Sequence, residues 1–358
     1  MKRKVYSVLC LSALIGITAP ATAQVDSQLS IHGYLTQGYG IANGGTFLGV
    51  SESGTGDYRN AAMQFRYALT DKGNVTLQFS HRRLGQSPVV TDEADVKLDW
   101  AFVGHRFGDV DVRIGRTPIP AGIYNEVRDV GVVLPLYRAP FNFYLEGAFT
   151  SETVDGVVAS YDVVPAAGWG LEFSGFAGGW GMINRMTIDS SYAGLAVRVE
   201  QGLGGQFWLT TPIDGLRAGV GASRQEIDQG DFAGTWKEWH ASVDGTFHWF
   251  TARAEYRVFD LPILDYAAYY GYLGLHATER LTFHGQADFA DLEYAPLPSV
   301  DFNDAYTAGA SYAFQPNLVL KGEAHFTKGY WADAPVIDFT SDRPASVNYV
   351  VISLSTAF

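Results

Sequence analysis

Alternation of apolar with polar or small residues recurs along almost the whole chain and limits what it can fold into. The period of two is clear at 29–36, 61–69, 75–80, 250–258, 281–289 and 318–326. Successive side chains of a β-strand point to opposite faces, so this period predicts strands with one apolar and one polar face. The sequence therefore predicts an all-β protein.

Turn-forming segments of two kinds separate these strands. Short ones lie at 70–74, 108–109, 278–280 and 315–317, and longer Gly-, Asp- or Pro-rich ones at 42–57, 84–95, 225–234, 291–302 and 331–346. Roughly seventeen segments read as strands, whereas a bacterial transmembrane barrel has an even number. We predict a transmembrane antiparallel β-barrel of about 16 strands, with 18 as the alternative and 207–224 as the least certain region.

A soluble β-sandwich or β-helix would also alternate, so the two faces must be compared. The polar faces carry isolated Arg, Glu, His and Gln among small residues, which suits a wet lumen better than a surface in bulk water. Aromatic residues near segment ends predict girdles at two membrane interfaces; they are Trp236, Trp239, Trp249, Tyr256, Tyr269 and Tyr306. Both observations favour the barrel.

Composition excludes other classes. The 358 residues are 47% apolar and 18% charged with a mean hydropathy of −0.00, so a polytopic helical membrane protein is excluded. The net charge of −13 argues against nucleic acid as a partner. Eight scattered histidines predict no metal site, and the absence of a P-loop or dinucleotide motif predicts no cofactor.

The first segment has the features of a signal peptide. A basic stretch, residues 2–4, precedes an apolar stretch, residues 5–17, and a small-x-small site at Ala21–Ala23. We predict that residues 1–23 are removed and that 24–358 form the barrel, which places the protein in the outer membrane. Cys10 is the only cysteine, so the exported part has no disulfide and no cysteine ligand.

The last segment supports a closed barrel. Residues 349–358 alternate and end on Phe358, which resembles the final strand of Gram-negative outer-membrane proteins, where such a Phe is the insertion signal. We expect this strand to pair with the first, because pairing removes both sheet edges.

One long segment interrupts the strand pattern. Residues 117–147 contain Pro118, Pro120, Pro135 and Pro140 and many apolar and aromatic side chains. A long segment of this kind inside a compact fold is commonly functional, and its apolar content predicts that it packs against the lumen wall. We expect it to narrow the channel.

The same segment carries a family resemblance. Gly115-Arg116, Pro120, Gly122, Tyr124-Asn125-Glu126, Arg128-Asp129-Val130, Pro135, Pro140 and Tyr144 are similar to a run found in Gram-negative porins, the phosphate-selective and dicarboxylate-type trimeric porins. The resemblance implies a sixteen-stranded homotrimer whose third external loop folds inward. Leu134, Glu146 and Glu152 depart from the basic residues that many relatives have there, which argues against strict anion selectivity.

Charged residues on the predicted loop and on polar strand faces are the candidate pore lining. Arg113 and Arg116 are expected to face the lumen or its mouth by strand phase. The full candidate set is Arg66, Arg82, Arg113, Arg116, Tyr124, Glu126, Arg128, Asp129, Arg138, Glu146, Arg253 and Arg257. Arginines opposite loop acids would set up a transverse field. Alternatively, these arginines pair with acids such as Glu200 and Glu255 to hold the loop on the wall.

The sequence thus predicts a porin for passive diffusion of small hydrophilic, charged solutes. Its expected partners are outer-membrane lipid, lipopolysaccharide, the solutes and two further copies of the chain. A structural or adhesive barrel with partner-binding loops is the alternative, and a phospholipase-type enzyme is a weaker one. Ser242 shares a strand face with His240, and Asp288 with His284, but such pairs are frequent on polar faces.

Overall fold

The computed structural model describes residues 28–85, 95–145, 152–188, 191–228, 233–262, 264–293, 299–330 and 345–358. The predicted signal peptide, residues 1–23, lies outside the described residues. None of the helices within these ranges is long and apolar enough to cross a membrane.

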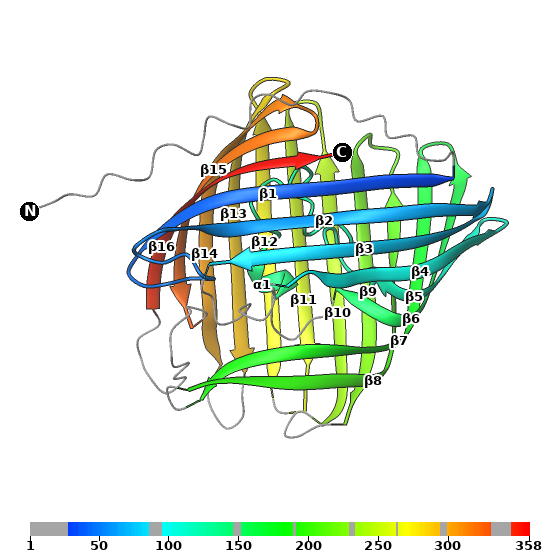
Figure 1. Cartoon of the computed structure of the whole chain (residues 1–358), viewed down its shortest axis with the longest axis horizontal. Coiled ribbons are helices and arrows are strands. Elements are labelled where there is room, and N and C mark those ends of the chain that lie inside the picture. Colours follow the sequence, from blue (N-terminus) through cyan, green and yellow to red (C-terminus); the bar gives the residue numbers. More distant parts are fainter. Residues whose placement is uncertain are drawn as a thin grey trace, which may run out of the picture.

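Sixteen antiparallel strands close into one barrel, as the alternation predicts (Figure 1). Each strand pairs with its neighbours in sequence, and the last, β16, pairs with the first, β1. The strands are β1 Leu29–Asn43, β2 Thr55–Thr70, β3 Gly73–Leu84, β4 Lys97–Phe107, β5 Val110–Pro118, β6 Thr153–Ala166, β7 Trp169–Ile188, β8 Ser191–Thr210, β9 Leu216–Ile227, β10 Gly234–Thr246, β11 Phe250–Asp260, β12 Asp265–His276, β13 Leu281–Glu293, β14 Val300–Gln315, β15 Leu318–Gly329 and β16 Ala345–Ala357.

The seam between β1 and β16 is paired up to the end where β1 begins and β16 finishes. Gly33 and Phe358 exchange two backbone hydrogen bonds, with N–O distances of 3.0 and 2.9 Å. Further along, Tyr39 lies opposite Ile352 and Asn43 opposite Asn348. Pairing of the terminal strands satisfies the backbone groups that an open edge would leave exposed.

The two ends of the barrel differ. Short turns join β2 to β3, β4 to β5 and β6 to β7 at the end where β1 begins and β16 finishes. Longer connections occupy the opposite end, and the third of these, residues 119–152, links β5 to β6. It contains the short helix α1 (Phe141–Tyr144). The loop that the sequence singles out is therefore the third loop of the loop-bearing end.

Aromatic side chains form a belt on the outer face of β10–β14. Trp239, Tyr256, Tyr269 and Tyr306 are exposed and Phe289 is half-buried among them, and the ring centroids of the five follow one another at 5.1, 6.3, 5.2 and 5.6 Å. This belt is the predicted girdle along one side of the barrel. Trp236, which the sequence also placed in a girdle, has no exposed surface and packs inside, so that prediction is wrong.

Candidate functional site

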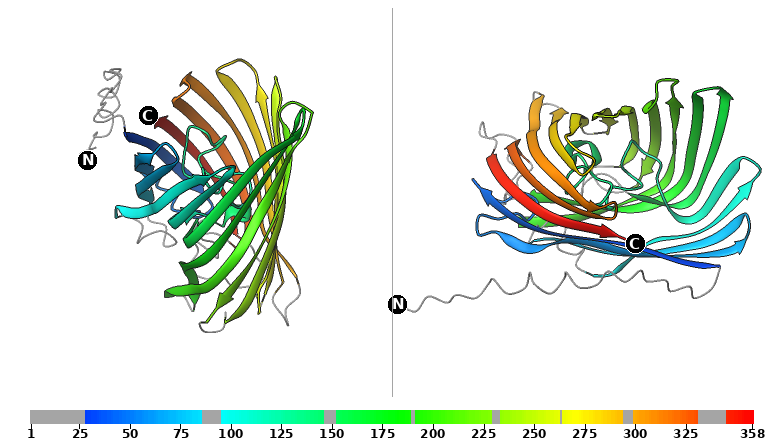
Figure 2. Two further views of the ribbon diagram at one scale, coloured as in Figure 1. Left: turned by 90° about the vertical axis from the view of Figure 1, so that its right-hand side faces the viewer. Right: turned by 90° about the horizontal axis from the view of Figure 1, so that it is seen from above.

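The loop between β5 and β6 lies inside the barrel rather than above it (Figure 2). Its helix α1 contacts β11, β12 and β13, on the far side from β5. The loop side chains Tyr124, Leu134, Phe143 and Tyr144 are buried together against Tyr270 and Tyr272 of β12. Burial of these apolar side chains explains why so proline-rich a segment adopts a defined path.

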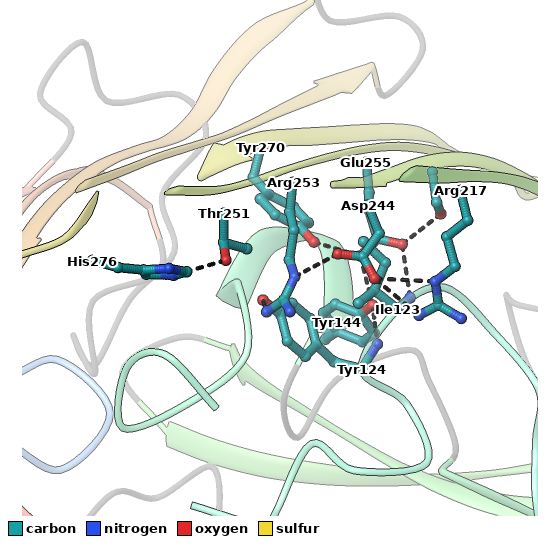
Figure 3. Close-up of polar contacts among 11 residues, drawn as sticks. Ile123, Tyr124, Tyr144, Arg217, Asp244, Thr251, Arg253, Glu255, Tyr270 and His276 are labelled. Atoms are coloured by element: carbon teal, nitrogen blue, oxygen red, sulfur yellow. Dashed lines mark hydrogen bonds and ion pairs between the residues drawn. The ribbon is translucent and has the colours of Figure 1, made fainter. Parts of the chain in front are cut away.

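Glu255 of β11 is the centre of the attachment (Figure 3). This buried carboxylate accepts hydrogen bonds from the Ile123 N–H at 2.9 Å and the Tyr144 hydroxyl at 2.6 Å, both on the loop. It also accepts from the hydroxyls of Ser242 at 2.6 Å and Tyr270 at 2.7 Å, both on the wall. Two oxygens with four donors are fully satisfied, so the buried charge becomes an anchor.

A second anchor lies on β15. Lys321 is buried, and its Nζ donates to the carbonyl oxygens of Gly131 and Leu136, the latter at 2.8 Å. Two residues along the strand, Glu323 accepts from the Tyr137 N–H at 2.7 Å. These wall side chains replace backbone partners that an irregular loop cannot supply for itself.

The helix α1 is held by β11, β13 and β14. The Asn142 N–H donates to Asp288 at 3.1 Å, and the amide side chains of Asn142 and Asn303 hydrogen-bond at 2.9 Å. Arg257 donates to the Phe143 carbonyl oxygen at 2.9 Å and pairs with Glu238 at 2.9 Å. All of these side chains are buried, so Arg257 holds the loop and does not line an open path.

The start of the loop is held from the opposite side. Arg128 is buried and pairs with Glu152 at 2.7 Å, and the Asn60 amide of β2 donates to Asp129 at 2.7 Å. Arg82 lies 3.8 Å from Asp129 and 3.9 Å from Glu152. Burial, and then the charge of Glu152, raise the pKa of Asp129 well above its usual range, and Arg82 and Arg128 oppose the shift.

A chain of charges and rings runs along the wall beside the loop (Figure 3). Arg253 donates to the Tyr124 hydroxyl at 2.8 Å and to Asp244 at 2.8 Å. Asp244 also pairs with Arg217 at 3.0 Å, and the Arg217 guanidinium lies 4.4 Å from the ring centroid of Trp208. One carboxylate shared by two arginines leaves a local excess of positive charge.

Side-chain exposure distinguishes two parts of the interior. Glu255, Asp288 and Lys321 keep no more than 3% of their surface under the loop. On the other side, Arg113 of β5 faces Glu126 of the loop at 3.6 Å, with 33% and 46% of their side chains exposed. Inward-facing Arg217 of β9 is 37% exposed. The solvated part of the lumen therefore lies between the loop and the wall of β5–β9.

The structure places Arg116 outside the lumen. Its cross-strand partner is Asp155, at 2.8 Å, and its neighbour on the same strand face is Ile114, which is 59% exposed. The opposite face carries Thr117 and Val154, which are paired across the strands and fully buried by the loop. Successive side chains of a strand point to opposite faces, so residues 113 and 116, three apart on β5, cannot both point inward. The prediction that Arg116 faces the lumen is therefore wrong.

The other predicted residues divide by position. Arg66 lies on the same face of β2 as Asn60 and Gln64, whose side chains contact inward-facing partners, so this face is the inner one, as predicted from the sequence. Arg138 is buried in the loop, with its guanidinium 5.6 Å from the Tyr58 ring. Glu146 lies outside the described residues. Within the described ranges, the structure brings Glu126, Arg113 and Arg253 to the solvated side of the loop, and Tyr124 is buried with only its hydroxyl bonded to Arg253. It places Arg82, Arg128, Asp129 and Arg257 in the attachments of the loop.

Sequence reasoning underestimated the anchoring residues. It named Glu255 only as a partner for arginines, and it gave Lys321, Glu323 and Asn142 no role. The sequence does carry a signal for them: a large polar residue at an inward position of a strand opposite an apolar loop. Burying such a side chain is costly unless it has a hydrogen-bond partner, so it is expected to bind the loop. The Ser–His pair that it noted is not one: Ser242 donates to Glu255, and His240 accepts from the Gly122 N–H at 3.2 Å.

The parts of the chain that the structure describes contain no group of three or more His, Cys, Asp or Glu side chains that could hold a metal ion. No protein-family model matches the sequence, and no curated protein matches it.

Solved structures match over nearly the whole chain. OmpF of Salmonella typhi, in a complex with daunomycin, is 12% identical, covers 92% of this chain and 97% of its own, and has a TM-score of 0.61. An anion-selective porin from Comamonas acidovorans is 13% identical, with 93% and 100% covered and a TM-score of 0.59. OmpT of Vibrio cholerae, in a trimer form, is 9% identical, with 92% and 99% covered and a TM-score of 0.55. At these identities the likeness establishes the fold: the chain is a closed 16-stranded antiparallel barrel like those of outer-membrane porins.

Proposed function

We propose that the protein is an outer-membrane porin that passes small hydrophilic solutes by diffusion, without turnover or cofactor. The observation that carries the proposal is the inward-folded loop, which is fixed by buried polar contacts on one side and leaves solvated charges on the other. A purely structural barrel has no need for a rigid partition inside its lumen. The likeness of the fold to porins of known structure also supports the proposal.

The proposed path runs between the loop and the inner faces of β5–β9. At its edge Arg113 of the wall forms an ion pair with Glu126 of the loop, and both side chains are partly exposed, while Arg217 and Arg253 lie further along the same side. Charges of opposite sign on facing walls create a transverse field, which orients dipolar and charged solutes as they pass. The lining is therefore of mixed sign, and the solute class that fits it is small and charged or zwitterionic.

The test is the permeability of the refolded full chain in planar bilayers under a salt gradient. We expect stepwise conductance, and we expect Glu126→Gln to shift the reversal potential toward anions because it removes the exposed acid of the passage. Arg113→Gln should shift it toward cations. Each change should alter the permeability ratio by roughly two- to fivefold, as for single charges at a constriction.

Arg116→Gln is the matched control, since Arg116 is on the neighbouring part of β5 but points outward. It should leave the permeability ratio unchanged. A barrel that folds, as judged by heat-dependent migration in gels, but conducts nothing would overturn the proposal. The structural or adhesive function would then replace it.

The outer face supports a trimer as the working form. The outward side chains of β1–β5 and β16 form an exposed apolar face of aliphatic residues, among them Leu35, Met63, Val103, Ile114 and Ile352, together with aromatic residues such as Tyr39, Tyr67 and Phe79. The half-exposed pair Arg116–Asp155 lies on the outer face at β5 and β6. A charge pair facing hydrocarbon is costly, whereas a subunit interface accommodates it. We infer that this side contacts neighbouring copies.

A further inference from the structure

A small cavity lies under the start of the loop, between the loop and the inner faces of β1, β3 and β4. Its volume is about 20 Å³, and about 10–15 Å³ is enough to hold one water-sized group. The polar side chains that line it are Tyr34, Gln78 and Asp99 from the wall, and Glu126, Arg128, Asp129 and Glu152 from the loop. The cavity therefore has room for one small polar group.

Tyr34 presents a polar atom to this cavity that no described residue satisfies. The residue keeps only 8% of its surface, and its hydroxyl is buried without a hydrogen-bond partner in the described part of the chain. The charged groups that act on this hydroxyl are the carboxylates of Asp99, Asp129 and Glu152 and the guanidinium of Arg82. A buried hydroxyl without a partner costs free energy, so its position beside three carboxylates indicates that a further group binds between them.

The carboxylates around the cavity outnumber the cations. Asp129 and Glu152 share the guanidinium groups of Arg82 and Arg128. Asp99 accepts one hydrogen bond, at 2.8 Å, from a neutral side-chain amide on β3, and within the described ranges it forms no ion pair. Three carboxylates against two guanidinium groups leave one negative charge, which a bound cation would neutralise.

The size and the chemistry of the cavity select a primary ammonium group. Its three N–H donors need three acceptors, which the carboxylates of Asp99 and Glu152 and the hydroxyl oxygen of Tyr34 supply. A metal ion would need a closer set of oxygen ligands, and the described residues offer no group of three or more acidic or histidine side chains that could hold one. A quaternary ammonium is too large for the cavity and has no N–H to donate.

Glu126 connects the cavity with the proposed solute path. Its side chain lines the cavity and is also 46% exposed on the solvated side of the loop, where it faces Arg113. A cation in the passage therefore meets Glu126 at the edge of the cavity and Asp99 within it. Only the charged end of an organic amine fits inside, so the rest of such a molecule stays in the passage.

We propose that this cavity binds the –NH3+ group of primary amines that enter the channel, between Asp99, Glu152 and Tyr34. The inference rests on the proposed function for the route by which the amine arrives. Binding is measured in detergent without a membrane, and conduction is measured without an amine. A barrel that conducts but binds no amine would overturn this inference alone, and one that binds an amine but does not conduct would overturn the proposed function alone.

The test is the melting temperature of the refolded full chain in detergent while methylammonium chloride replaces sodium chloride at constant ionic strength. A ligand that binds only the folded state stabilises it, and we expect a rise of roughly 2–4 °C at saturation. Tetramethylammonium chloride and potassium chloride, exchanged in the same way, should give no rise. An equal rise with either salt would overturn the proposal, because any cation would then have the same effect. The absence of a rise with methylammonium would overturn it as well.

Two variants separate ligand binding from a structural role. Tyr34→Phe removes a hydroxyl that bonds to no described residue, so the melting temperature without methylammonium should not fall, while the rise with it should shrink. Asp99→Asn keeps an acceptor for the Gln78 amide but removes the charge, and we expect at least tenfold weaker binding of methylammonium. Asp162→Asn on β6 makes the same charge change outside the cavity and should bind as the wild type does. Wild-type affinity in Asp99→Asn would overturn the cavity as the site.

Protonation of Asp129 is the competing way to neutralise these carboxylates. Burial and the charge of Glu152 raise the pKa of Asp129, and the groups that face it are Tyr34, Asn60, Arg82, Asp99, Arg128 and Glu152. A proton on Asp129 removes the excess negative charge that the amine would otherwise neutralise. Methylammonium should therefore bind several-fold more tightly at pH 8 than at pH 5, and equal or tighter binding at pH 5 would overturn the assignment to these residues.

Discussion

Tyr144 shows how a single hydroxyl links the loop to the wall. It donates to Glu255 at 2.6 Å and accepts from the Tyr124 N–H at 2.7 Å, while the ring is buried between the two. Removing such a hydroxyl leaves two buried groups without a partner, which costs more than the bond itself contributes.

We therefore predict that Tyr144→Phe lowers the free energy of unfolding by about 1–3 kcal/mol. The urea midpoint of the barrel in lipid vesicles measures this effect. Tyr312→Phe, at an exposed tyrosine on the outer face, is the control and should leave the midpoint unchanged. An unchanged midpoint in Tyr144→Phe would show that the Glu255 contacts do not hold the loop.

Asp129 gives the attachment a pH dependence with a definite sign. Its pKa is raised by burial and by Glu152, so the folded state binds the proton more tightly than the unfolded state does. This contribution to stability is complete below the ordinary aspartate pKa of 3.8 and is lost as the pH rises through the raised value. We expect Asp129→Asn, which keeps an acceptor for Asn60, to remove it. Melting temperatures of both proteins from pH 4 to pH 8 should converge at the acid end and favour the variant at the alkaline end.

At the scale of elements, strands were predictable and the loop path was not. The period of two located most strands because each has one face on lipid and one on the interior, and the even count selected 16 from roughly seventeen segments. The loop was recognised from its prolines and aromatics. Its anchors were not, because Glu255, Lys321 and Asp288 come from strands far away in sequence, and only closure of the barrel brings them together. The prediction for Arg116 was wrong for a simpler reason: side chains alternate between the two faces of β5, so Arg116 cannot lie on the face of Arg113.

Lys321→Met tests the loop as an element. Methionine fits the same length but leaves the carbonyl oxygens of Gly131 and Leu136 without their donor. We expect larger current fluctuations and higher mean conductance, because this part of the loop is freed to move away from the wall. Lys328→Met, on the opposite face of the same strand, should behave as the wild type in single-channel recordings. Identical traces for both variants would contradict the anchoring role.

The outer surface of the whole molecule has two sides: a continuous aromatic belt crosses β10–β14, and a mixed face of aliphatic and aromatic side chains covers β16 and β1–β5. The first matches the lipid interface, and we assign the second to contacts between copies. The sequence alternation could reveal outward positions but not which of them meet lipid, because both environments are apolar. Only the arrangement of strands around the barrel separates the two sides.

Val103→Arg should therefore break the proposed trimer. A charge on the apolar face of β1–β5, where Val103 is 48% exposed, would be buried in each interface between copies. Light scattering in detergent should report monomers for this variant. Leu273→Arg, at a 45% exposed position on the β12 side, should remain trimeric. Trimers of both would exclude β4 from the interface.

The loop also crosses the place where the barrel closes. Gly131 lies against Thr36 of β1 and Ser355 of β16, whose hydroxyls hydrogen-bond at 3.0 Å across the seam, and a Cβ at Gly131 would collide with both. Neighbouring loop residues are bonded to Lys321 of β15 on one side and to Asn60 of β2 on the other. The loop can make all of these contacts only when β1 and β16 lie side by side, that is, after the barrel has closed. Once formed, the contacts hold the strands on both sides of the seam together and resist lateral opening of the wall. Completion of folding and completion of the permeability barrier are then the same event.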